Sequence, residues 1–505
     1  MAKQVKFNKD AKEKIKTGID VTCKAIRTTI GPKGRNAFID DAMQPKITND
    51  GKTIANSINF EDKLENMGAW LVKNASGQTD DIAGDGTSTT AVLLKAIIDE
   101  AQKRPESPMD VKRSLIKVGA EVTAQIEKMA QPIKDKQISE VATISAESRE
   151  IGDLIAEVIE KVGRKVPVKV DNNDAPVIEY EISEGLESNA GLAHTGFINN
   201  ARNGTCELED VYVFATDRRI SSLPDLMGLL RMLETNKITS LVLLLSDIEN
   251  SVLGSLIMSK QAGTFNSCVI KARNAELEDM VAMSGATLVS ELSGIKLADV
   301  KLEHLGKVKK IISNEKKTTI INESKTAQDK EAMLRTLADN SKNMYEKKFL
   351  IERADKLSGG IAVIKVGAYT DSEREYQKYK IEDAVNATKS ALDEGIVEGG
   401  GMCLYRISTK LKGNSIGEVI LRNALKEPLK AIIENCDEDY TAIVKKLPNK
   451  KGYDALNGKN VDMIKAGIID PARVTRCAFQ NALESAANYI TMNVTIADNN
   501  ETIKQ

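Results

Sequence analysis

The spacing of apolar residues changes twice along this 505-residue chain, and this change constrains the fold more than any other feature. Near both ends the apolar residues recur every three or four positions, as on one face of a helix. Between about residues 184 and 360, short apolar runs alternate with helical stretches, which is typical of an α/β domain. The pattern permits one helical domain built from both ends of the chain, with an α/β domain inserted into it.

The N-terminal part shows the helical spacing clearly. Residues 10–30 carry one apolar stripe, which ends at Gly31-Pro32 and consists of Ile15, Ile19, Cys23, Ile26 and Ile30. A short strand is predicted over residues 36–40 and a second helix over residues 61–79. Residues 91–98 (AVLLKAII) are apolar nearly all round, so a helix there is expected in the interior of a domain.

The centre of the chain shows strand spacing instead. Residues 166–170 place valine at every second position, and Pro167 restricts this strand to the edge of a sheet. Further strands are predicted at 177–182, 211–214, 241–245, 268–270 and 287–289. Residues 327–357 are typical of two amphipathic helices, and residues 361–366 return as a strand. From residue 382 to about 490 the spacing is helical again.

Length and composition exclude several classes of protein. At about 100–200 residues per domain, the length predicts roughly three domains. The 71 basic residues are balanced by 73 acidic ones, so the basic excess of a dedicated nucleic-acid binder is absent. No apolar run approaches the ~20 residues that span a bilayer, and the first residues lack a signal-peptide core. We therefore expect a cytoplasmic protein with neither nucleic acid nor a membrane as its partner.

Few residue types are available for chemistry. Six cysteines are scattered without a Cys-x-x-Cys pair, which predicts reduced, packed thiols rather than a disulfide or a metal site. Only two histidines are present, so a histidine metal centre or a serine–histidine catalytic relay is not expected. Chemistry must therefore rest on carboxylates, backbone amides and a bound cofactor.

Residues 84–90 (GDGTSTT) are the most informative short motif. Two glycines allow a tight turn in which successive N–H groups point at one anion, and the N-terminus of the following helix adds positive charge. The hydroxyl residues can donate to phosphate oxygens, and Asp85 can hold a Mg²⁺ ion. A plain helix N-cap is the alternative. No Gly-Lys-Ser/Thr follows, so this is not the P-loop pattern.

Four other turns are weak signals when each is taken alone. Residues 31–35 (GPKGR) can be a helix stop with a solvated basic turn, and residues 49–51 (NDG) an exposed hairpin turn. The three glycines at 399–401 indicate close approach of another group, with a loose linker as an equal alternative. Residues 469–471 (IDP) are most simply a turn that opens a helix.

Taken in order, these motifs resemble those of group I chaperonins, the GroEL family. The resemblance runs from residue 3 to about residue 497, which is essentially the whole chain. Its sharpest blocks are 31–36 (GPKGRN), 60–69 (FEDKLENMGA), 84–87 (GDGT), 359–367 (GGIAVIKVG), 381–384 (IEDA), 399–401 (GGG) and 470–476 (DPARVTR). Agreement across so many separated blocks is not expected by chance, so the chain is identified as a divergent member of this family.

The resemblance implies a GroEL-like, α/β multidomain fold. A mostly helical equatorial domain that binds ATP would take residues 1–130 and 394–505. A small α/β intermediate domain that acts as a hinge would take residues 131–183 and 362–393. An α/β apical domain that binds polypeptides would take residues 184–361. These boundaries agree with the changes in apolar spacing.

The same resemblance implies ATP hydrolysis with Mg²⁺ and K⁺, and it assigns roles to particular residues. Asp85 looks like the Mg²⁺ ligand. Asp383, on the hinge domain, resembles the carboxylate that orients the attacking water, and Asp50 supports hydrolysis from the other side. The backbones of Thr29 and Asn49 are expected near K⁺. The nucleotide itself would contact Thr29, Gly31, Pro32, Asp85, Gly86, Thr87, Ser88, Thr89, Gly400, Asp454, Ala455 and Asp470.

Two of these positions depart from the family pattern. Asn49 stands where a lysine usually precedes Asp-Gly, and a K⁺ contact through its backbone carbonyl would tolerate the change. Asp454 stands where the usual Gly-Tyr-Asn-Ala motif has an amide. A carboxylate cannot donate an N–H to adenine, which puts the contacts to the base and the nucleotide affinity in doubt.

By resemblance, the groove that receives polypeptide lies between helices at 223–233 and 251–261. Its unspecific apolar surface would be formed by Phe197, Met227, Leu230, Leu253, Ile257 and Met258. Packing in the apical core is the alternative for any one of them. Leu192 and Gly196 stand where tyrosines are usual. The implied partners are unfolded polypeptides, further copies of the chain in a seven-membered ring, single or double, and a possible lid co-chaperonin.

Three functions remain open at this point. The first is an ATP-dependent chaperonin that captures non-native polypeptides, encloses them in a ring cavity and promotes their folding. The second is a ring-forming holdase or scaffold with weak or lost ATP turnover and no lid co-chaperonin. The third, a monomeric ATP-dependent enzyme acting on small molecules, would need a substrate pocket that no motif suggests. Because Asp50, Asp85 and Asp383 are all present, the active machine is favoured.

Overall fold

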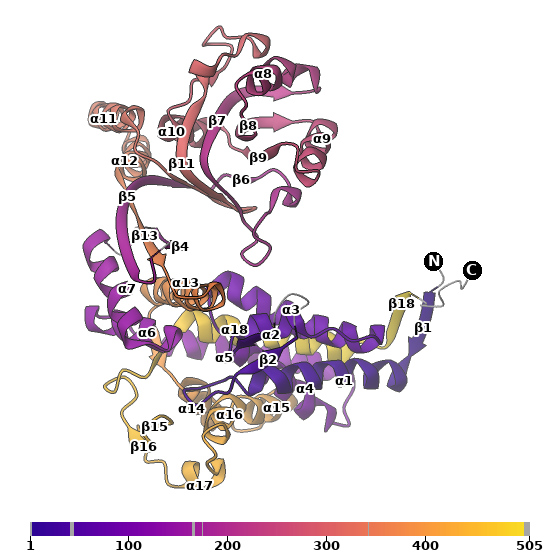
Figure 1. Cartoon of the computed structure of the whole chain (residues 1–505). Coiled ribbons are helices and arrows are strands. Elements are labelled where there is room, and N and C mark those ends of the chain that lie inside the picture. Colours follow the sequence, from indigo (N-terminus) through magenta and orange to yellow (C-terminus); the bar gives the residue numbers. More distant parts are fainter. Residues whose placement is uncertain (1–2, 41–44, 164–166, 174, 342, 499–505) are drawn as a thin grey trace. The chain divides into compact units, whose positions relative to one another are not determined.

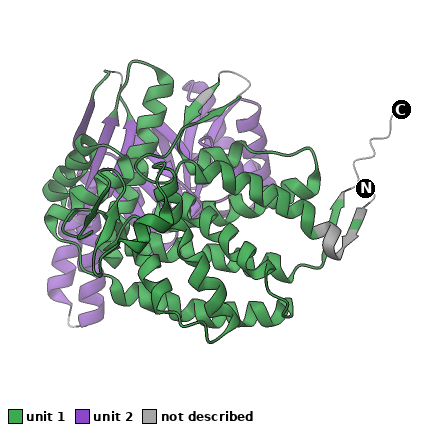
Figure 2. Ribbon diagram, turned by 90° about the horizontal axis from the view of Figure 1, so that it is seen from below, with its two compact units in different colours: residues 1–164, 172–177, 366–505 green, residues 165–171, 178–365 purple. Residues whose placement is uncertain are grey.

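The computed structural model describes residues 3–40, 45–163, 167–173, 175–341 and 343–498. The chain divides into two compact units (Figures 1 and 2). Unit 1 comprises residues 1–164, 172–177 and 366–505, and unit 2 comprises residues 165–171 and 178–365. Unit 2 is thus inserted into unit 1, which is built from the chain segments on either side of unit 2.

Unit 1 is mostly helical. Its helices are α1 (Asn8–Arg27), α2 (Gly51–Ser57), α3 (Lys63–Ala83), α4 (Thr87–Gln102), α5 (Pro108–Met129), α6 (Asp135–Ala146), α7 (Arg149–Val162), α13 (Asp371–Glu394), α14 (Met402–Lys410), α15 (Ile416–Ala424), α16 (Glu427–Glu434), α17 (Tyr440–Lys445) and α18 (Ala472–Thr491). Its strands pair as β1 (Lys3–Phe7) with β18 (Val494–Asp498), β2 (Ala37–Ile39) with β3 (Lys46–Thr48), β14 (Ile396–Glu398) with β17 (Ile469–Pro471), and β15 (Gly452–Asp454) with β16 (Lys459–Val461).

The core of unit 1 forms around α4 and α18. The stripe predicted on α1 is buried, and α4 is buried on nearly all sides, as its apolar sequence predicts. Helix α18 packs against α3, α4 and α5 (Figure 1). Each fully buried aliphatic side chain contributes about 1.5–3 kcal/mol, so these contacts hold the N-terminus of α4 firmly in place.

Helices α1 and α3 approach each other closely at two glycines. A Cβ atom on Gly68 would overlap the carbonyl oxygen of Ile15, and a Cβ on Gly18 would overlap that of Glu65. The helix pair therefore has no room for larger residues at these positions. Gly77 lies further along α3, and nothing lies within 4 Å of the place where its Cβ would be.

We expect Gly68→Ala to lower the free energy of unfolding by about 2 kcal/mol, because the added methyl group forces the helices apart. Gly77→Ala is the matched control on the same helix, and it should be neutral or stabilising by up to about 1 kcal/mol, since alanine is the better helix former. Urea unfolding of both variants measures the difference. Equal stability of Gly68→Ala and the wild type would contradict the close approach.

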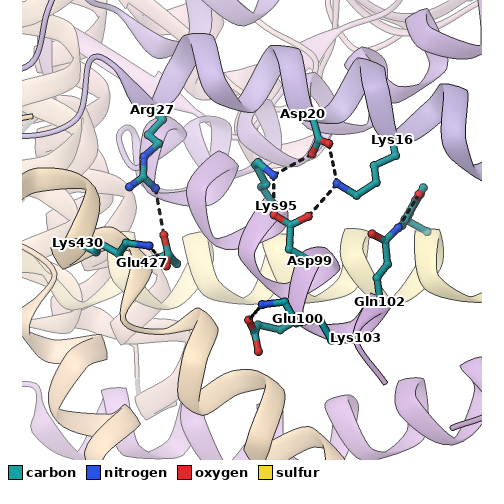
Figure 3. A network of polar contacts seen from close by, with 11 residues as sticks. Lys16, Asp20, Arg27, Lys95, Asp99, Glu100, Gln102, Lys103, Glu427 and Lys430 are labelled. Carbon is teal, nitrogen blue, oxygen red and sulfur yellow. Dashed lines mark hydrogen bonds and ion pairs between the residues drawn. The ribbon is translucent and has the colours of Figure 1, made fainter. Parts of the chain in front are cut away.

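A network of alternating charges links α1 to α4 (Figure 3). Lys16 Nζ lies 2.6 Å from Asp20 Oδ2 and 2.9 Å from Asp99 Oδ1. Lys95 Nζ lies 2.9 Å from Asp20 Oδ1 and 2.5 Å from Asp99 Oδ2. Partly exposed ion pairs contribute only about 0–1 kcal/mol each, so the network aligns the two helices more than it stabilises them.

A second set of charges in Figure 3 fixes the end of α1 against α16. Arg27 Nη1 and Lys430 Nζ lie 3.1 and 3.0 Å from the carboxylate of Glu427. Gly31, which follows the end of α1, also lies against α16, since a Cβ atom on it would lie 3.0 Å from Ile432 Cγ2.

Unit 2 is built on one curled sheet with the strand order β4-β13-β5-β12-β11-β7-β8-β9-β6, and β10 pairs with β7. Its strands are β4 (Val168–Asn172), β5 (Ile178–Ser188), β6 (Gly191–Leu192), β7 (Cys206–Ile220), β8 (Ser240–Ile248), β9 (Asn266–Lys271), β10 (Leu288–Val289), β11 (Gly306–Ser313), β12 (Thr318–Ile321) and β13 (Gly360–Val366). Its helices are α8 (Pro224–Thr235), α9 (Asn250–Gln261), α10 (Asn274–Ser284), α11 (Lys325–Asn340) and α12 (Met344–Ser358), with single turns η1 (Thr195–Phe197), η2 (Leu297–Asp299) and η3 (Leu302–His304). The strand after Pro167 is at the edge, as predicted.

The helix-rich α/β fold agrees with the fold predicted from the sequence. The structure differs from the prediction only in local details. Helix α13 begins at Asp371, eleven residues before the predicted start, because the charged residues of its first turns hide the apolar spacing. Residues 49–51 do not form a hairpin turn, since Asp50 caps α2 instead. No helix among the described residues is long and apolar enough to cross a membrane. The boundaries of a separate hinge domain stay a prediction, and α6, α7 and α13 belong to unit 1.

Candidate functional site

The turn between α3 and α4 leaves the N-terminus of α4 without a side-chain cap. Gly84 ends α3 and Gly86 precedes α4, both with positive φ angles (76° and 97°). Gly86, the N-cap residue, has no side chain that could accept a hydrogen bond from the first-turn N–H groups of α4, so a capping aspartate or threonine at this position does not apply. The N–H groups of the first turn, which comprises Thr87, Ser88 and Thr89, therefore form a place suited to an anion.

Three segments meet at Ser88, in the first turn of α4. Its hydroxyl oxygen lies 3.2 Å from Thr29 Oγ1. A Cβ atom on Gly51, the first residue of α2, would lie 2.8 Å from the same oxygen, so the start of α2 also lies against Ser88. Gly31 has a φ angle of 90°, and its carbonyl accepts a hydrogen bond from Gly34 N–H at 2.9 Å. Residues 29–34 thus form a tight turn beside the candidate anion site, with Pro32 inside it.

Two carboxylates with raised pKa values lie at the turn between α3 and α4. Asp85 accepts hydrogen bonds from Gly86 N–H and from Ser145 Oγ, the latter at 3.1 Å, but burial raises its pKa. Asp470 lies in β17, opposite Val397 of β14. Burial and the charge of Asp85 together raise the pKa of Asp470 to about 7. Two buried acidic groups, one of which feels the charge of the other, form a place suited to a cation.

The residues present fit a magnesium–nucleotide complex better than a metal ion alone. No group of three or more histidine, cysteine or acidic side chains that could hold a metal was found within the described parts of the chain. Mg²⁺ usually takes one or two carboxylates and completes its shell with water and phosphate oxygens. Asp85 beside the uncapped N-terminus of α4 offers that combination.

The raised pKa of Asp470 predicts a pH-dependent stability of the ligand-free protein. Between pH 3.8 and about 7 the folded state holds a proton that the unfolded chain releases, so the free energy of unfolding falls as the pH rises through this range. Asp470→Asn imitates the protonated form, so we expect a higher Tm than the wild type at pH 8 and a smaller loss of stability between pH 5 and 8. Thermal unfolding at several pH values measures this.

The exposed residue Asp437, which pairs with Arg35 at 3.0 Å, provides the control for this experiment. Asp437→Asn should leave the pH dependence as in the wild type. An Asp470→Asn variant that loses stability with rising pH as steeply as the wild type would contradict the raised pKa of Asp470.

Helix α13 lies directly against the turn between α3 and α4. A Cβ atom on Gly84 would overlap the side chain of Asn386, and Ser390 Oγ donates a hydrogen bond to the carbonyl of Ala83 at 2.9 Å. Asp383 lies one turn before Asn386. Burial opposes the charge of Lys52, but its pKa is raised by the carboxylates of Asp80, Asp81 and Asp383. The structure thus places Asp383 within electrostatic reach of α2 and of the end of α3.

Asn49 and Asp50 have structural partners of their own. Asp50 accepts hydrogen bonds from Lys52 N–H at 3.3 Å and Thr53 N–H at 2.9 Å, which begins α2. The side chain of Asn49 donates to Glu147 Oε2 at 2.9 Å and accepts from the Tyr376 hydroxyl at 3.2 Å. An amide can do both, whereas the lysine usual at this position can only donate. Asn49 therefore ties the start of α2 to α13 and to the turn after α6.

Asp454 is engaged in its own turn. Its carboxylate accepts hydrogen bonds from Leu456 N–H at 3.0 Å, Asn457 N–H at 3.2 Å and Asn457 Nδ2 at 2.8 Å. The aspartate thus shapes the loop after β15, a role that sequence comparison did not indicate. Ala455 is buried next to it and belongs to an apolar cluster with Ile30 and Ile432.

The three consecutive glycines are sites of close approach and not a loose linker. A Cβ atom on Gly399 would lie 2.8 Å from Asp470 Oδ1, and one on Gly401 would lie 2.6 Å from Leu429 N. Gly400 and Gly401 both have positive φ angles, 61° and 75°. Gly399 lets the end of β14 pass next to Asp470, and Gly401 is the residue from which α14 begins.

Comparison with known proteins assigns the family. The model of the TCP-1/cpn60 chaperonin family matches residues 23–222 and 238–500, which is most of the chain. The chain belongs to this family. Chaperonins of this kind are in general ATPases that bind substrate proteins and form ring oligomers. The fold is therefore GroEL-like, as the resemblance implied.

Two solved chaperonin structures are similar to this chain over nearly its whole length. Both are of the chaperonin gp146 from the bacteriophage EL 2 (Pseudomonas aeruginosa), in the presence of ATP-BeFx. The TM-scores are 0.67 for crystal form II and 0.66 for crystal form I, at 20% sequence identity. Each comparison covers 98% of this chain and 99% of gp146. At this identity the likeness shows the shared fold.

In this chaperonin, the candidate polypeptide surface in unit 2 is smaller than predicted. Met258 of α9 is 71% exposed and Met227 of α8 is 38% exposed, while Leu230 and Ile257 are partly buried against the core of unit 2. Figure 1 shows both helices beside β8 and β9. Gly196 leaves room for α9, because a Cβ there would lie 2.8 Å from Ile257 Cγ2.

Phe197 and Leu253 differ from the prediction. Both are buried in the core of unit 2, so neither presents a surface to a polypeptide in this structure. Phe197 belongs to the turn η1, which packs against α9 and β9. Leu253 lies on the face of α9 that packs against the sheet, and Met258 lies on the exposed one.

A second exposed apolar patch on unit 2 escaped the sequence analysis. It lies on the helix pair α11 and α12 and consists of Leu337, Met344, Tyr345 and Phe349, all of which are exposed. Met344 and Tyr345 are adjacent apolar residues at the start of α12, and no periodic spacing in the sequence marks them as exposed. Unit 2 therefore exposes apolar side chains on α8 and α9 and on α11 and α12.

Proposed function

We propose that this protein is an ATP-driven chaperonin that captures non-native polypeptides on unit 2 and hydrolyses ATP in unit 1. The observation that carries the proposal is the arrangement at the start of α4. An uncapped helix N-terminus, two carboxylates of raised pKa and the carboxylate-bearing helix α13 come together there. The presence of ATP-BeFx in the gp146 crystals supports a nucleotide as the ligand.

In the proposed mechanism, the first-turn N–H groups of α4 and the hydroxyls of Thr87, Ser88 and Thr89 hold the phosphates. Asp85 would hold Mg²⁺, which neutralises phosphate charge. Asp383 orients a water molecule toward the γ-phosphorus and accepts its proton. The bond from the γ-phosphorus to the bridging oxygen breaks as the new one forms, which yields ADP and phosphate. Such a reaction depends on positioning more than on a strong base.

The remaining nucleotide contacts are proposed on the resemblance together with the positions found here. Gly31 and Pro32 would line the nucleotide, Gly400 and Asp470 would contact the ribose, and the loop at 454–455 would lie near the base. Asp50 would support hydrolysis from the start of α2, and the carbonyls of Thr29 and Asn49 would bind K⁺. The meeting of residues 29, 51 and 88 supports a common site.

For the assembly, we propose a seven-membered ring, single or double, located in the cytoplasm and used with a possible lid co-chaperonin. The equatorial domain would comprise residues 1–130 and 394–505, the hinge 131–183 and 362–393, and the apical domain 184–361. Packing of α13 against α6 and of α6 against α7 supports a hinge segment of that composition.

Two measurements on the full chain test the proposal. The first is steady-state release of phosphate from ATP with Mg²⁺ and K⁺, and the second is suppression of the aggregation of a chemically denatured protein. We expect both activities, and ring particles by electron microscopy that change with ATP. Capture without hydrolysis would instead indicate a holdase or scaffold, and the absence of both would contradict a chaperonin function.

A further inference from the structure

Four side chains from three separate segments of unit 1 meet beside α13, one turn before Asp383. Lys380 Nζ lies 2.8 Å from Oε1 of Glu147, the residue that follows α6. The side chain of Asn49 donates to the same carboxylate, at 2.9 Å from Oε2, and accepts from the Tyr376 hydroxyl at 3.2 Å. Lys380 and Tyr376 belong to α13, whereas Asn49 directly precedes the N-cap residue of α2. We call these four residues the α13 clasp.

The ion pair of the α13 clasp is less exposed than an ordinary surface pair. The side chain of Lys380 is 13% exposed, and its ammonium group lies 5.9 Å from the centre of the Tyr376 ring, which is a favourable contact for a cation. Burial opposes the charge of Lys380, but the carboxylate of Glu147 outweighs this effect and raises its pKa. The lysine therefore depends on its partner, because removal of Glu147 would leave a mostly buried charge unpaired.

Glu147 has a backbone conformation that favours glycine. Its φ angle is 54° and its ψ angle is 22°, in the left-handed region, where helices commonly end on glycine or asparagine. A glycine would relieve the strain, but it would also remove the carboxylate that Asn49 and Lys380 share. The strained residue thus joins the end of α6, the start of α2 and the helix α13 at one side chain.

The α13 clasp lies on the part of α13 that carries Asp383. Lys380 precedes Asp383 by three residues, so both lie on one side of the helix. Asn386 follows Asp383 by three residues and lies against Gly84, where a Cβ atom would overlap its side chain. Helix α13 is therefore held at two places, by the α13 clasp before Asp383 and by the turn between α3 and α4 after it.

We propose that Glu147, Lys380 and Tyr376 are positioning residues for ATP hydrolysis, which together with Asn49 hold α13 so that Asp383 faces the nucleotide. This inference rests on the function proposed above, and the three residues lie outside the set that the resemblance assigned to hydrolysis. They act through Asp383 and not on the phosphate or the water. Because hydrolysis depends on position, a displacement of about 1 Å can lower the rate about a hundredfold.

Lys380→Met in the full-length protein tests the positioning role. We expect the kcat of ATP hydrolysis to fall about ten- to a hundredfold while the Kd for ATP changes no more than about twofold, because the proposed phosphate-binding amides belong to α4. Lys380→Arg keeps the charge and should retain most of the rate. Lys378→Met is the matched control, since residues two apart on a helix point to nearly opposite sides. Wild-type kcat in Lys380→Met would overturn the proposal.

Combining Lys380→Met with Asp383→Asn separates positioning from a general loss of structure. If the α13 clasp acts through Asp383, the second substitution lowers kcat no further than Asp383→Asn alone, whereas a further tenfold decrease would contradict this. Hydrogen exchange of residues 371–383 tests the contact without ATP, and it should be faster in Lys380→Met than in the wild type or Lys378→Met. A wild type that does not hydrolyse ATP would overturn the proposed function and the positioning role together, and unchanged exchange would overturn the α13 clasp alone.

Discussion

Replacing Asp383 by asparagine is expected to lower the kcat of ATP hydrolysis at least about a hundredfold while the Kd for ATP changes by no more than a few-fold. An amide can still contact a water molecule, but it cannot accept its proton, and a positioned general base typically contributes about 10²- to 10⁴-fold. Asp383 belongs to α13, which packs on the turn before α4, whereas the first-turn amides that would hold the phosphates belong to α4 itself. Binding and hydrolysis should therefore separate.

Single-turnover phosphate release and equilibrium nucleotide titration measure the two quantities. Asp371→Asn is the matched control, because this carboxylate lies on the same helix but its side chain is 88% exposed and pairs with Arg374 at 2.5 Å. It should hydrolyse ATP at the wild-type rate. Hydrolysis retained in Asp383→Asn would remove the role given to Asp383. Loss of binding as well, with an unchanged Tm, would instead place this carboxylate in the nucleotide contact.

The turn between α3 and α4 could be predicted because its information is local. Two glycines one residue apart, followed by hydroxyl residues and an apolar helix, determine where the chain turns and which groups come next. The structure shows the consequence, since Gly86 precedes α4 without a capping side chain. The start of α18 after Asp470-Pro471 was predicted for the same reason.

The side-chain partners of Asp454 and Asn49 could not be predicted from residue types alone. A comparison of residue types treats Asp454 as an amide that has lost a donor. The structure shows a carboxylate whose oxygens accept three hydrogen bonds from the residues just after it. Asn49 likewise stands in for a lysine, and its contact with Glu147 involves a residue 98 positions away.

The sequence also could not predict which face of an apolar helix is exposed. Helix α9 has apolar residues on more than one side, so spacing alone gives no preference between Leu253 and Met258 as surface residues. Packing against the sheet of unit 2 decides this, and it buries Leu253 together with Phe197. The same limit applies to α12, where the exposed residues at its start have no periodic signal.

Met258→Glu is expected to weaken the capture of a denatured polypeptide at least about tenfold. Met258 is 71% exposed, and its flexible thioether side chain can adapt to many apolar sequences. Burying an apolar side chain of this size contributes about 1.5–3 kcal/mol, and each 1.4 kcal/mol corresponds to a factor of ten in affinity. A carboxylate would also have to be desolvated on contact with an apolar segment, which opposes binding further.

Tyr345→Glu provides the comparison that separates the two apolar surfaces of unit 2. Tyr345 is 88% exposed on α12, so either substitution should leave the Tm of the folded protein nearly unchanged. Suppression of aggregation, measured by light scattering against the concentration of each variant, gives the relative affinities. If α9 captures polypeptide, Tyr345→Glu behaves like the wild type. If instead Tyr345→Glu loses capture and Met258→Glu retains it, the surface on α11 and α12 is the binding site. The reason is that an introduced carboxylate weakens capture only where the bound polypeptide would bury it.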